Sequence, residues 1–466
     1  MAYQILLIIP PKKVFSVIYP LGLGYLAATL KKEHYSVQIA NYSLGNYSLS
    51  QALSEIIALK PNFIGLTLYS FAYNSVKIMI SEIKKKLPET KIAVGGPHAS
   101  ALPLETLKDL KADFSIVGEG EEILPKLIHC LEHNTPLTSL SGIAYWQEGR
   151  PIYQSGTNIV KDLDSLPLPD WESMPPFMYH DTAGAIFSKK FLTAPILTSR
   201  GCPHHCTFCA SYLLHGRKYR KRSPERVVAE IAFLAKTYGV KEFLIFDDTF
   251  GEDKQHAQAI CEQILKKKLK ISWRTPVGVR LDTIDTELLA IFKSSGCYQL
   301  GFGIESLSPQ ILSATKKPLY KKTITKQIEL AKKQGIETMG YFILGLPEDT
   351  VQSIEETIQF AVDSPLDYLS FTHAVPLPGT PSFEKFYLHT ESKFIDWDRF
   401  HFYTSKPFKL STIPPKKLRK LYLKAYLSAY TKPKRALKIL KGFTQSQKFS
   451  LLKTIKFMYS IMRNLW

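Results

Sequence analysis

The sequence predicts an α/β protein with an N-terminal doubly wound, Rossmann-like parallel sheet, a partial (β/α)6 TIM-like barrel and a basic, mainly helical C-terminal region. Two observations support this fold: apolar runs alternate with stretches of helical periodicity, and the net charge of +19 is concentrated near the C-terminus. With 466 residues and 45% apolar content, the chain can form two or three domains with their own cores. We expect an N-terminal domain at 1–140, a linker at 141–190, the barrel at 191–385 and the basic region at 386–466.

The N-terminal domain begins with a continuous apolar run, Ile5 to Ile9, that ends at two prolines. Such a run is typical of a strand buried on both faces of a parallel sheet. The alternation of apolar run and helical segment then repeats along the domain. The expected strands are 5–9, 36–40, 63–67, 91–94 and 114–117, and the expected helices are 21–30, 49–59 and 74–86.

Ligands of doubly wound sheets bind beyond the carboxyl ends of the strands. The loops at these ends are rich in glycine, which lets backbone approach a ligand closely, although glycine after a strand is also ordinary turn chemistry. We expect a ligand site formed by Pro10, Thr67, Tyr69, Gly95, Gly96, His98, Gly118, Glu119 and Gly120.

A proline-rich stretch without periodicity, from about 142 to 193, separates this domain from a second series of alternating elements. Six strand-helix units in that series predict a partial barrel. The expected strands are 196–200, 243–246, 273–279, 298–304, 338–344 and 368–373, and the expected helices are 224–238, 256–267, 285–294, 321–334 and 351–362.

Functional residues of parallel barrels gather at the carboxyl ends of the strands. Asp248, Arg280 and Glu305 follow three successive strands of the predicted barrel, and Gly345 and Leu346 follow the next one. A single acidic residue at such a position could instead cap the following helix. The repetition at consecutive strand ends favours a binding site.

Three cysteines, Cys202, Cys206 and Cys209, stand close together after the first barrel strand. Clustered thiolates at this spacing predict an iron-sulfur cluster or a zinc ion. A cluster of four irons needs one ligand per iron, so three cysteines would leave one iron free to bind a substrate or cofactor. Zinc stays an alternative, because His204 or His205 could supply the fourth ligand of a structural zinc site.

The other three cysteines, Cys130, Cys261 and Cys297, stand alone in apolar or helical contexts, so we expect buried free thiols rather than disulfides. The chain enters an apolar strand without a charged n-region or cleavage site. We therefore expect no signal peptide and a location in the reducing cytoplasm, which suits an oxygen-sensitive cluster.

The C-terminal region is strongly basic, with 17 Lys and Arg but no Asp or Glu between Arg399 and Trp466. Such a region could meet anionic lipid, an acidic protein or nucleic acid, but we recognise no nucleic-acid module and expect no nucleic-acid partner. The stretch 449–466 has amphipathic spacing and could lie in a membrane interface or pack on its own domain. No apolar run reaches about 18 residues, so we expect peripheral membrane contact at most.

The run Ser199 to Ala210, with Phe208 directly before the last cysteine, resembles the signature of the radical S-adenosylmethionine (SAM) enzymes. In that family three cysteines hold a [4Fe-4S] cluster, whose open iron chelates SAM and reduces it. The resemblance implies that Cys202, Cys206 and Cys209 bind the cluster. The SAM-binding residues that it implies, together with the strand-end groups that suit SAM, are Phe208, Asp248, Arg280, Glu305, Ile343, Gly345 and Leu346.

Three segments of the N-terminal domain, 20–27, 94–98 and 117–121, look like the cobalamin-binding domain that is fused to many radical SAM enzymes. The resemblance implies that the strand-end residues of this domain bind cobalamin. The Asp-x-His-x-x-Gly motif that gives cobalt a histidine ligand in other cobalamin proteins is absent, so we expect His98 to lie near the corrin rather than on cobalt. A vestigial domain without the cofactor stays an alternative.

This resemblance, to the class B radical SAM methyltransferases, implies that the enzyme methylates an unactivated carbon of a small-molecule or lipid-like substrate. In that family one SAM yields a 5′-deoxyadenosyl radical that abstracts hydrogen, methylcobalamin delivers the methyl group, and a second SAM remethylates the cobalamin. The reduction of SAM implies an electron donor such as flavodoxin or ferredoxin. Two alternatives stay open: a radical rearrangement, cyclisation or other non-methylating reaction, and a non-catalytic iron-sulfur or zinc scaffold.

Overall fold

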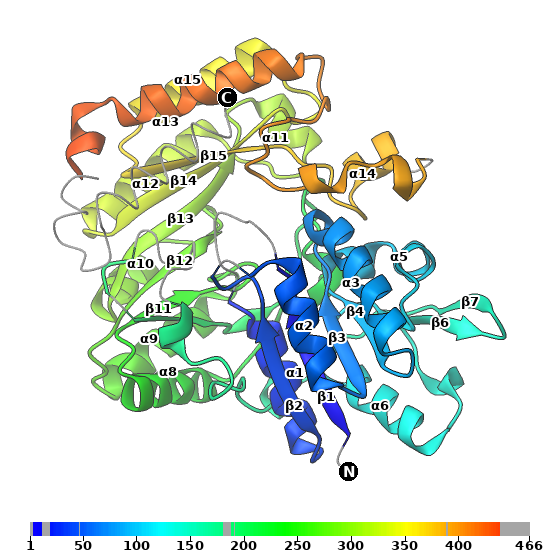
Figure 1. Ribbon diagram of the computed structural model, residues 1–466. Coiled ribbons are helices and arrows are strands. Elements are labelled where there is room, and N and C mark those ends of the chain that lie inside the picture. Colours follow the sequence, from blue (N-terminus) through cyan, green and yellow to red (C-terminus); the bar gives the residue numbers. More distant parts are fainter. Residues whose placement is uncertain are drawn as a thin grey trace.

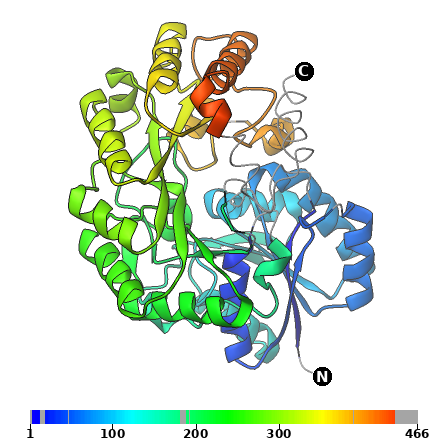
Figure 2. The same ribbon diagram turned by 90° about the vertical axis from the view of Figure 1, so that its left-hand side faces the viewer.

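The computed structural model describes residues 3–11, 19–45, 47–179, 188–190, 192–387 and 390–438. Two sheets form its centre (Figure 1). The blue and cyan N-terminal elements build the first sheet and its helices, and the green and yellow elements build the second. Figure 2 shows the second sheet as an arc with helices on its outer side, while its inner side is turned toward the first domain.

The first sheet confirms the predicted doubly wound arrangement, with parallel strands in the order β2-β1-β3-β4-β5. Leu6 and Leu7 of β1 belong to different hydrophobic clusters, because successive side chains of a strand point to opposite faces. Both faces are therefore buried. The elements are β1 (Gln4–Ile9), α1 (Leu21–Lys32), β2 (Ser36–Asn41), α2 (Leu49–Leu59), β3 (Phe63–Thr67), α3 (Tyr73–Lys86), β4 (Lys91–Gly95), α4 (Pro97–Ala101), α5 (Pro103–Leu110), β5 (Phe114–Ile116) and α6 (Ile123–His133).

The first sheet continues into the range that we expected to be a linker. β6 (Ile143–Gln147) pairs antiparallel with β5, and β7 (Arg150–Gln154) pairs antiparallel with β6. Glu148 and Gly149 between them both have positive φ, as in a two-residue type I′ hairpin turn. Pro151 lies in β7 at the edge of the sheet, where proline is tolerated, and its presence hid the strand from the sequence pattern.

The second sheet confirms the predicted partial barrel: six parallel strands in the order β8-β11-β12-β13-β14-β15. The spatial order follows the chain order, as right-handed strand-helix-strand units require. The strands are β8 (Thr193–Ile196), β11 (Glu242–Ile245), β12 (Ser272–Val279), β13 (Cys297–Glu305), β14 (Glu337–Leu344) and β15 (Tyr368–His373), and the helices are α8 (Pro224–Tyr238), α9 (Lys254–Lys266), α10 (Thr286–Ser294), α11 (Pro309–Ala314), α12 (Lys321–Lys333) and α13 (Val351–Asp363).

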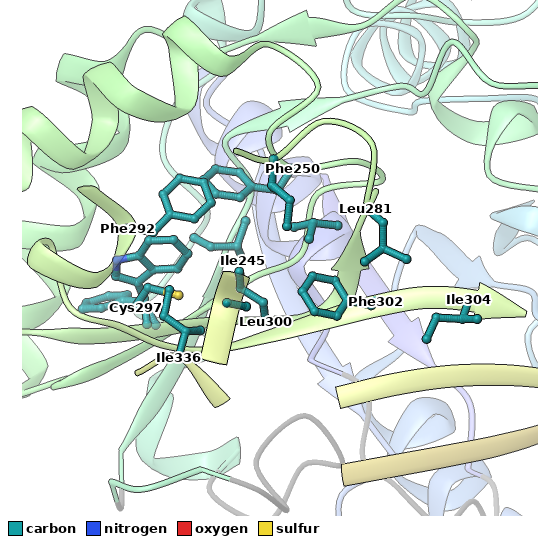
Figure 3. Close-up of a cluster of buried hydrophobic side chains, with 14 of the residues drawn as sticks. Ile245, Phe250, Leu281, Phe292, Cys297, Leu300, Phe302, Ile304 and Ile336 are labelled. Carbon is teal, nitrogen blue, oxygen red and sulfur yellow. The ribbon is translucent and has the colours of Figure 1, made fainter. Parts of the chain in front are cut away.

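A hydrophobic core fills the space between the barrel strands and their helices (Figure 3). The rings of Phe250, Trp273 and Phe292 contact one another with centroids 5.1 to 5.7 Å apart. Cys261 and Cys297 lie in this core as free thiols, as expected. Cys130 is likewise free and buried in the first domain.

The strand predicted at 196–200 is broken, because the chain leaves the barrel after β8. β9 (Ser199–Arg200) pairs antiparallel with β10 (Arg220–Lys221) outside the barrel. Asp247 stabilises the chain at the point where the strand is interrupted. Its carboxylate accepts hydrogen bonds from the amide and the hydroxyl of Thr198, at 2.6 and 2.5 Å. These side-chain bonds replace the ladder bonds of a longer strand.

The C-terminal region is only partly helical. α15 (Pro415–Tyr430) packs against α13 and β15, and the hydroxyl of its Tyr430 donates a hydrogen bond to the carbonyl of Leu369 at 2.6 Å. Between α14 (Pro381–Tyr387) and α15, the described residues 390–414 are mostly irregular. Individual aromatic side chains hold this segment in place. Trp397, for example, packs in a hydrophobic cluster with residues of the first domain, and its exposed fraction is only 1%.

The amphipathic stretch expected at 449–466 lies outside the described residues. Among the helices that the structure does describe, none has the length and apolar character needed to cross a membrane.

Candidate active site

The three cysteines lie in one loop, residues 201–219, which β9 and β10 close at its base. The first of them follows Gly201, whose φ is +87°. A Cβ on Gly201 would lie 2.3 Å from the carbonyl oxygen of Lys218, so only glycine fits here. Toward its middle the loop is tied to the barrel, since the amide of Thr207 donates a hydrogen bond to the carbonyl of Thr315 at 3.1 Å.

The cysteine thiols are partly buried and lie within one another's electrostatic field. Burial, with smaller contributions from Cys209 and Asp248, raises the pKa of Cys202 to about 11, although a backbone hydrogen bond opposes the shift. Burial also raises the pKa of Cys206. The thiolate is the form that binds metal, so these groups need a cationic centre to hold them ionised. The donor set fits an iron-sulfur cluster, which supplies that positive charge.

The zinc alternative requires its ligands to surround a single position. A zinc ion draws its sulfur ligands to about 2.3 Å from one point, whereas the cysteines of a cluster bind different irons and stand further apart. Within the described ranges, no three His, Cys, Asp or Glu side chains converge on a position for a single metal ion. His204, one of the two candidate fourth ligands, is instead hydrogen-bonded through Nε2 to Glu252 at 2.9 Å.

Asp248, which follows β11, faces the cysteine loop. Its carboxylate lies 2.8 Å from Nδ1 of His215 in α7 (Tyr212–His215) and accepts a hydrogen bond from the amide of Gly201 at 2.9 Å. Burial by itself would raise the pKa of Asp248, but His215 and the Gly201 amide outweigh burial and lower it. In this geometry Asp248 positions the loop, whereas the sequence suggested a direct SAM contact.

Glu305 lies at the end of β13 close to Cys206 and pairs with Lys317, whose Nζ is 2.7 Å from Glu305 Oε1. Both side chains are nearly buried. Gly303 makes the room, because a Cβ there would lie 2.6 Å from the Lys317 ammonium. The sequence analysis missed Lys317, because this residue follows the short helix α11 and not a strand. Its position shortly after the strand that ends at Glu305 was the one feature of the sequence that could have indicated it.

Arg280, at the end of β12, also acts on the cysteine loop. Its guanidinium binds both carboxylate oxygens of Asp282, at 2.9 and 2.6 Å. The positive charges of Lys317 and Arg280 both favour the ionised form of Cys206. The charges of Lys317, Arg280 and Glu305 thus all act on the middle cysteine, and charges of both signs suit a zwitterionic amino acid group.

Phe208, Ile343 and Leu346 belong to one hydrophobic cluster, which also contains Leu68 and Tyr69 of the first domain. Residues expected beside adenine and residues expected beside the corrin thus pack against one hydrophobic cluster, in which Phe208, Ile343 and Tyr69 are partly buried.

Gly345, by contrast, serves packing. Its φ is +88°, and a Cβ would lie 2.5 Å from a methyl group of Leu418 in α15. Its amide and that of Leu346 each donate a hydrogen bond to Asp349 at 2.9 Å, which fixes the turn after β14. The glycine allows α15 to approach the end of the barrel strand.

At the carboxyl edge of the first sheet the structure brings together Pro10, Thr67, Tyr69, Gly95 and Gly96, which follow or end β1, β3 and β4. A Cβ on Gly95 would meet no atom within 4 Å, so this edge has open space beside its backbone. Gly96 has a φ of +95°, which glycine adopts without strain. A flat corrin ring can approach such an edge closely, so the residues fit cobalamin.

His98 does not lie on this open edge. It is 2% exposed in α4, its Nδ1 is 2.9 Å from the hydroxyl of Ser70, and its ring packs between Tyr73 and Trp397 at centroid distances of 4.8 and 4.7 Å. The C-terminal segment covers it, which the sequence could not show. His98 is thus a core residue that packs beneath the loop after β4.

Replacing His98 with glutamine is expected to make the protein less sensitive to acid. Burial lowers the pKa of His98 from 6.5 to about 3, so its contribution to stability is complete above pH 6.5 and is lost as the pH falls toward 3. Each pH unit in that window removes about 1.4 kcal/mol. Thermal unfolding midpoints at about pH 7 and about pH 5.5 measure the effect. The exposed His133 provides the control: His133→Gln should keep the acid sensitivity of the unmodified protein, and an equal sensitivity of His98→Gln would contradict the prediction.

The loop after β5 is engaged in packing and ion pairs. Glu119 binds Arg220 through both carboxylate oxygens, at 2.7 and 3.0 Å. Gly118 has a φ of +84°, and a Cβ there would lie 2.4 Å from the carbonyl oxygen of Asn158. Gly120 packs closely on α1. These three residues were expected to contact cobalamin; in the structure Glu119 pairs with Arg220, Gly118 packs on Asn158, and Gly120 packs on Leu26.

An open doubly wound sheet, a partial barrel and a three-cysteine loop occur together in radical SAM enzymes that carry a cobalamin-binding domain. Family models match both domains of this chain. The model of the radical SAM superfamily matches residues 196–361, and that of the B12 binding domain matches residues 12–128. The chain belongs to this family, whose cofactors are a [4Fe-4S] cluster, SAM and cobalamin, and it is a radical SAM enzyme of the cobalamin-dependent methyltransferase type.

Two curated relatives cover most of the chain. A protein of Pyrococcus horikoshii, described as an uncharacterized methyltransferase, is 32% identical over 440 residues, which span 92% of this chain and 93% of the relative. The cytidylyl-2-hydroxyethylphosphonate methyltransferase of Streptomyces wedmorensis is 29% identical over 78% of this chain and 76% of its own length. Among solved structures, the radical SAM methyltransferase TsrM of Kitasatospora setae, with cobalamin and a [4Fe-4S] cluster bound, has a TM-score of 0.67 at 20% identity and covers 82% of this chain and 74% of its own. This last likeness shows the fold.

Proposed function

We propose that the enzyme transfers a methyl group from SAM to an unactivated carbon of a small-molecule or lipid-like substrate. The observation that carries the proposal is the shared interface, in which Phe208 of the cysteine loop and Leu346 of the barrel pack in one cluster with Tyr69 of the first sheet. When bound, the cluster supplies the electron that cleaves SAM and cobalamin supplies the methyl group. Sites whose side chains pack against one cluster are close enough to act on the same substrate molecule.

In this proposal Cys202, Cys206 and Cys209 hold the cluster. The Glu305 carboxylate accepts hydrogen bonds from the ammonium group of SAM, and Arg280 and Lys317 bind its carboxylate. Phe208 and Ile343 form apolar walls for the adenine. The nearly buried Glu305–Lys317 pair supports these roles, because a buried charge pair beside the cysteine loop is well placed to bind the charged groups of SAM.

Replacing Lys317 with methionine is expected to weaken SAM binding by about tenfold or more while the cluster stays in place. The change removes one cation from the site and leaves Glu305 buried without its partner. Equilibrium dialysis of SAM against the anaerobic, cluster-loaded protein measures the loss, and iron analysis checks the cluster. Lys316 is the exposed neighbour, so Lys316→Met serves as the matched control. Equal SAM affinity in the Lys316 and Lys317 variants would remove Lys317 from the site.

The inner side of the barrel offers a place for the substrate. Phe342 and Leu344 of β14 pack toward the helices, so Tyr341, directly before Phe342, points to the other side, into the barrel. Its hydroxyl donates a hydrogen bond to the carbonyl of Pro276 at 2.5 Å. Beside it, Val277 is 48% exposed on an irregular part of β12. This largely apolar surface supports a substrate with a hydrocarbon or aromatic part.

The proposal is tested with protein that is purified anaerobically and reconstituted with iron, sulfide and hydroxocobalamin. Incubation with methyl-deuterated SAM and an electron donor, either flavodoxin or dithionite, should yield 5′-deoxyadenosine and deuterium label in the corrin fraction. Formation of 5′-deoxyadenosine without label in the corrin would favour a radical reaction without methyl transfer. Neither product, with an intact cluster, would contradict the catalytic proposal.

We also propose that the C-terminal region of the protein contacts an anionic membrane surface. The exposed side of α15 carries Lys416, Lys417 and Lys420. Leu427 of the same helix is 60% exposed, and Leu437, after the helix, is 53% exposed. Lysines around exposed apolar side chains suit an anionic lipid interface. Co-sedimentation with vesicles that contain phosphatidylglycerol should exceed that with pure phosphatidylcholine vesicles, and the combined substitutions Lys416→Glu, Lys417→Glu and Lys420→Glu should reduce it. Equal sedimentation with both lipids, or no effect of the substitutions, would count against this contact.

A further inference from the structure

Two buried arginines stand at the base of the cysteine loop. Arg200 and Arg220 lie opposite each other in the β9–β10 pair, and each side chain is 5% exposed. Two positive charges that are buried this completely are stable only when anionic partners lie close to them. Those partners come from the first domain.

The anionic partners are Glu119 and Glu121, in the loop after β5. Arg200 Nη2 lies 2.8 Å from Glu121 Oε1, and Arg200 Nη1 lies 3.5 Å from Glu119 Oε1. Arg220 binds Glu119 through both nitrogens, at 2.7 and 3.0 Å. We name these four residues the arginine–glutamate clamp. Burial alone would raise the pKa of Glu119, but Arg220 and Arg200 outweigh burial and lower it, so the Glu119 carboxylate is ionised at neutral pH.

The clamp reaches into the cysteine loop through a continuous series of hydrogen bonds. Arg220 Nη2 donates to the carbonyl of His215 at 2.8 Å. The ring of His215 binds Asp248 at 2.8 Å, and Asp248 accepts from the amide of Gly201, the residue before Cys202, at 2.9 Å. The position of the first cysteine therefore depends on groups that the first domain holds.

On its other side the clamp is connected to the open edge of the first sheet. The amide of Gly118, directly before Glu119, donates a hydrogen bond to the hydroxyl of Ser100 at 3.0 Å. Ser100 belongs to α4, the short helix that starts directly after Gly96. A ligand that orders the backbone at Gly95 and Gly96 would thus order the loop that carries the two glutamates.

We propose that the arginine–glutamate clamp couples the two cofactor sites, so that cluster binding in the cysteine loop and cobalamin binding at the first sheet strengthen each other. This inference rests on the proposed function, which places the two cofactors at these sites. The four residues are positioning residues, which act through the loop and through α4. By thermodynamic linkage, the factor by which the cluster raises cobalamin affinity equals the factor by which cobalamin raises cluster affinity.

The test measures the dissociation constant of hydroxocobalamin by anaerobic equilibrium dialysis, on full-length protein with and without the reconstituted cluster. The unmodified protein should bind cobalamin about 5- to 100-fold more tightly when the cluster is present, the usual range for coupled sites. In the variant that combines Glu119→Gln and Glu121→Gln this ratio should fall to about 1. Glu122→Gln, a change at the exposed neighbouring position, should keep the original ratio.

A spectroscopic readout separates coupling from general damage. Addition of cobalamin should change the electron paramagnetic resonance spectrum of the reduced cluster in the unmodified protein and in Glu122→Gln, but not in the double variant. If the double variant does not fold, Glu121→Gln alone, which leaves the bidentate Glu119–Arg220 pair intact, should lower the ratio below that of the unmodified protein. A ratio of 1 in the unmodified protein, or an unchanged ratio in the variant that folds, overturns the proposal. Because no methyl transfer is measured, the result stands apart from the success or failure of the proposed reaction.

Discussion

Replacing Cys206 with alanine is expected to reduce the iron content of the reconstituted protein to background and to lower SAM cleavage by more than about 100-fold. Each iron of a [4Fe-4S] cluster takes one ligand, and the loop offers three cysteines, so the variant leaves two irons without a thiolate. Changes in groups that only orient a metal ligand already cost about 10- to 100-fold. Iron and sulfide analysis and chromatographic detection of 5′-deoxyadenosine measure the two effects.

Cys130 provides the matched control for this prediction. It is a free, buried thiol in α6 of the first domain, outside the cysteine loop. Cys130→Ala should retain full iron content and SAM cleavage, with a loss of stability of about 1 kcal/mol from the small cavity. If Cys206→Ala kept its iron and its 5′-deoxyadenosine formation, another residue would have to serve as the ligand.

The parallel strands of the two sheets were predictable, because parallel strands buried on both faces appear as largely apolar runs. The run from Ile5 to Ile9 is an example, and the structure has β1 there. The hairpin of β6 and β7 was not predictable in this way, since it pairs antiparallel at the sheet edge and contains Pro151. The irregular segment 390–414 also escaped prediction, because individual aromatic side chains hold it against another domain instead of a periodic face.

Spacing and topology singled out the cysteine loop and the strand-end residues Arg280 and Glu305, and in the structure the charges of these two residues act on the Cys206 thiol. Lys317 and the two clamp arginines could not be predicted in this way, because their partners are remote in the chain or lie on other elements. Arg220 and Glu119, for example, are 101 residues apart in the chain. A sequence pattern also cannot distinguish a carboxylate that faces a ligand from one that faces an arginine. For that reason Glu119 was expected at the corrin although it binds Arg220.

Replacing Gly201 with alanine is expected to weaken iron binding by about tenfold or more, although the change removes no ligand. At a φ of +87° a non-glycine residue costs about 1–3 kcal/mol. In addition the new Cβ would lie 2.3 Å from the carbonyl oxygen of Lys218, so the backbone before Cys202 has to move. A cost of about 1.4 kcal/mol concentrated in the loop corresponds to a tenfold loss of affinity. Anaerobic titration of the apoprotein with iron and sulfide, followed by visible absorbance, measures it.

Gly239 separates the two causes of that loss. It caps α8 at a φ of +69°, and a Cβ there would meet no atom within 4 Å, so Gly239→Ala carries the backbone strain without the steric conflict and lies outside the cysteine loop. We expect Gly239→Ala to lower the free energy of unfolding by about 1 kcal/mol and to leave iron binding unchanged. If Gly201→Ala also bound iron normally, the loop would tolerate the backbone shift, and the contact with Lys218 would not fix the position of the first cysteine. Weak iron binding in Gly201→Ala alone would instead show that the cysteine loop has to be held in shape before the cluster binds.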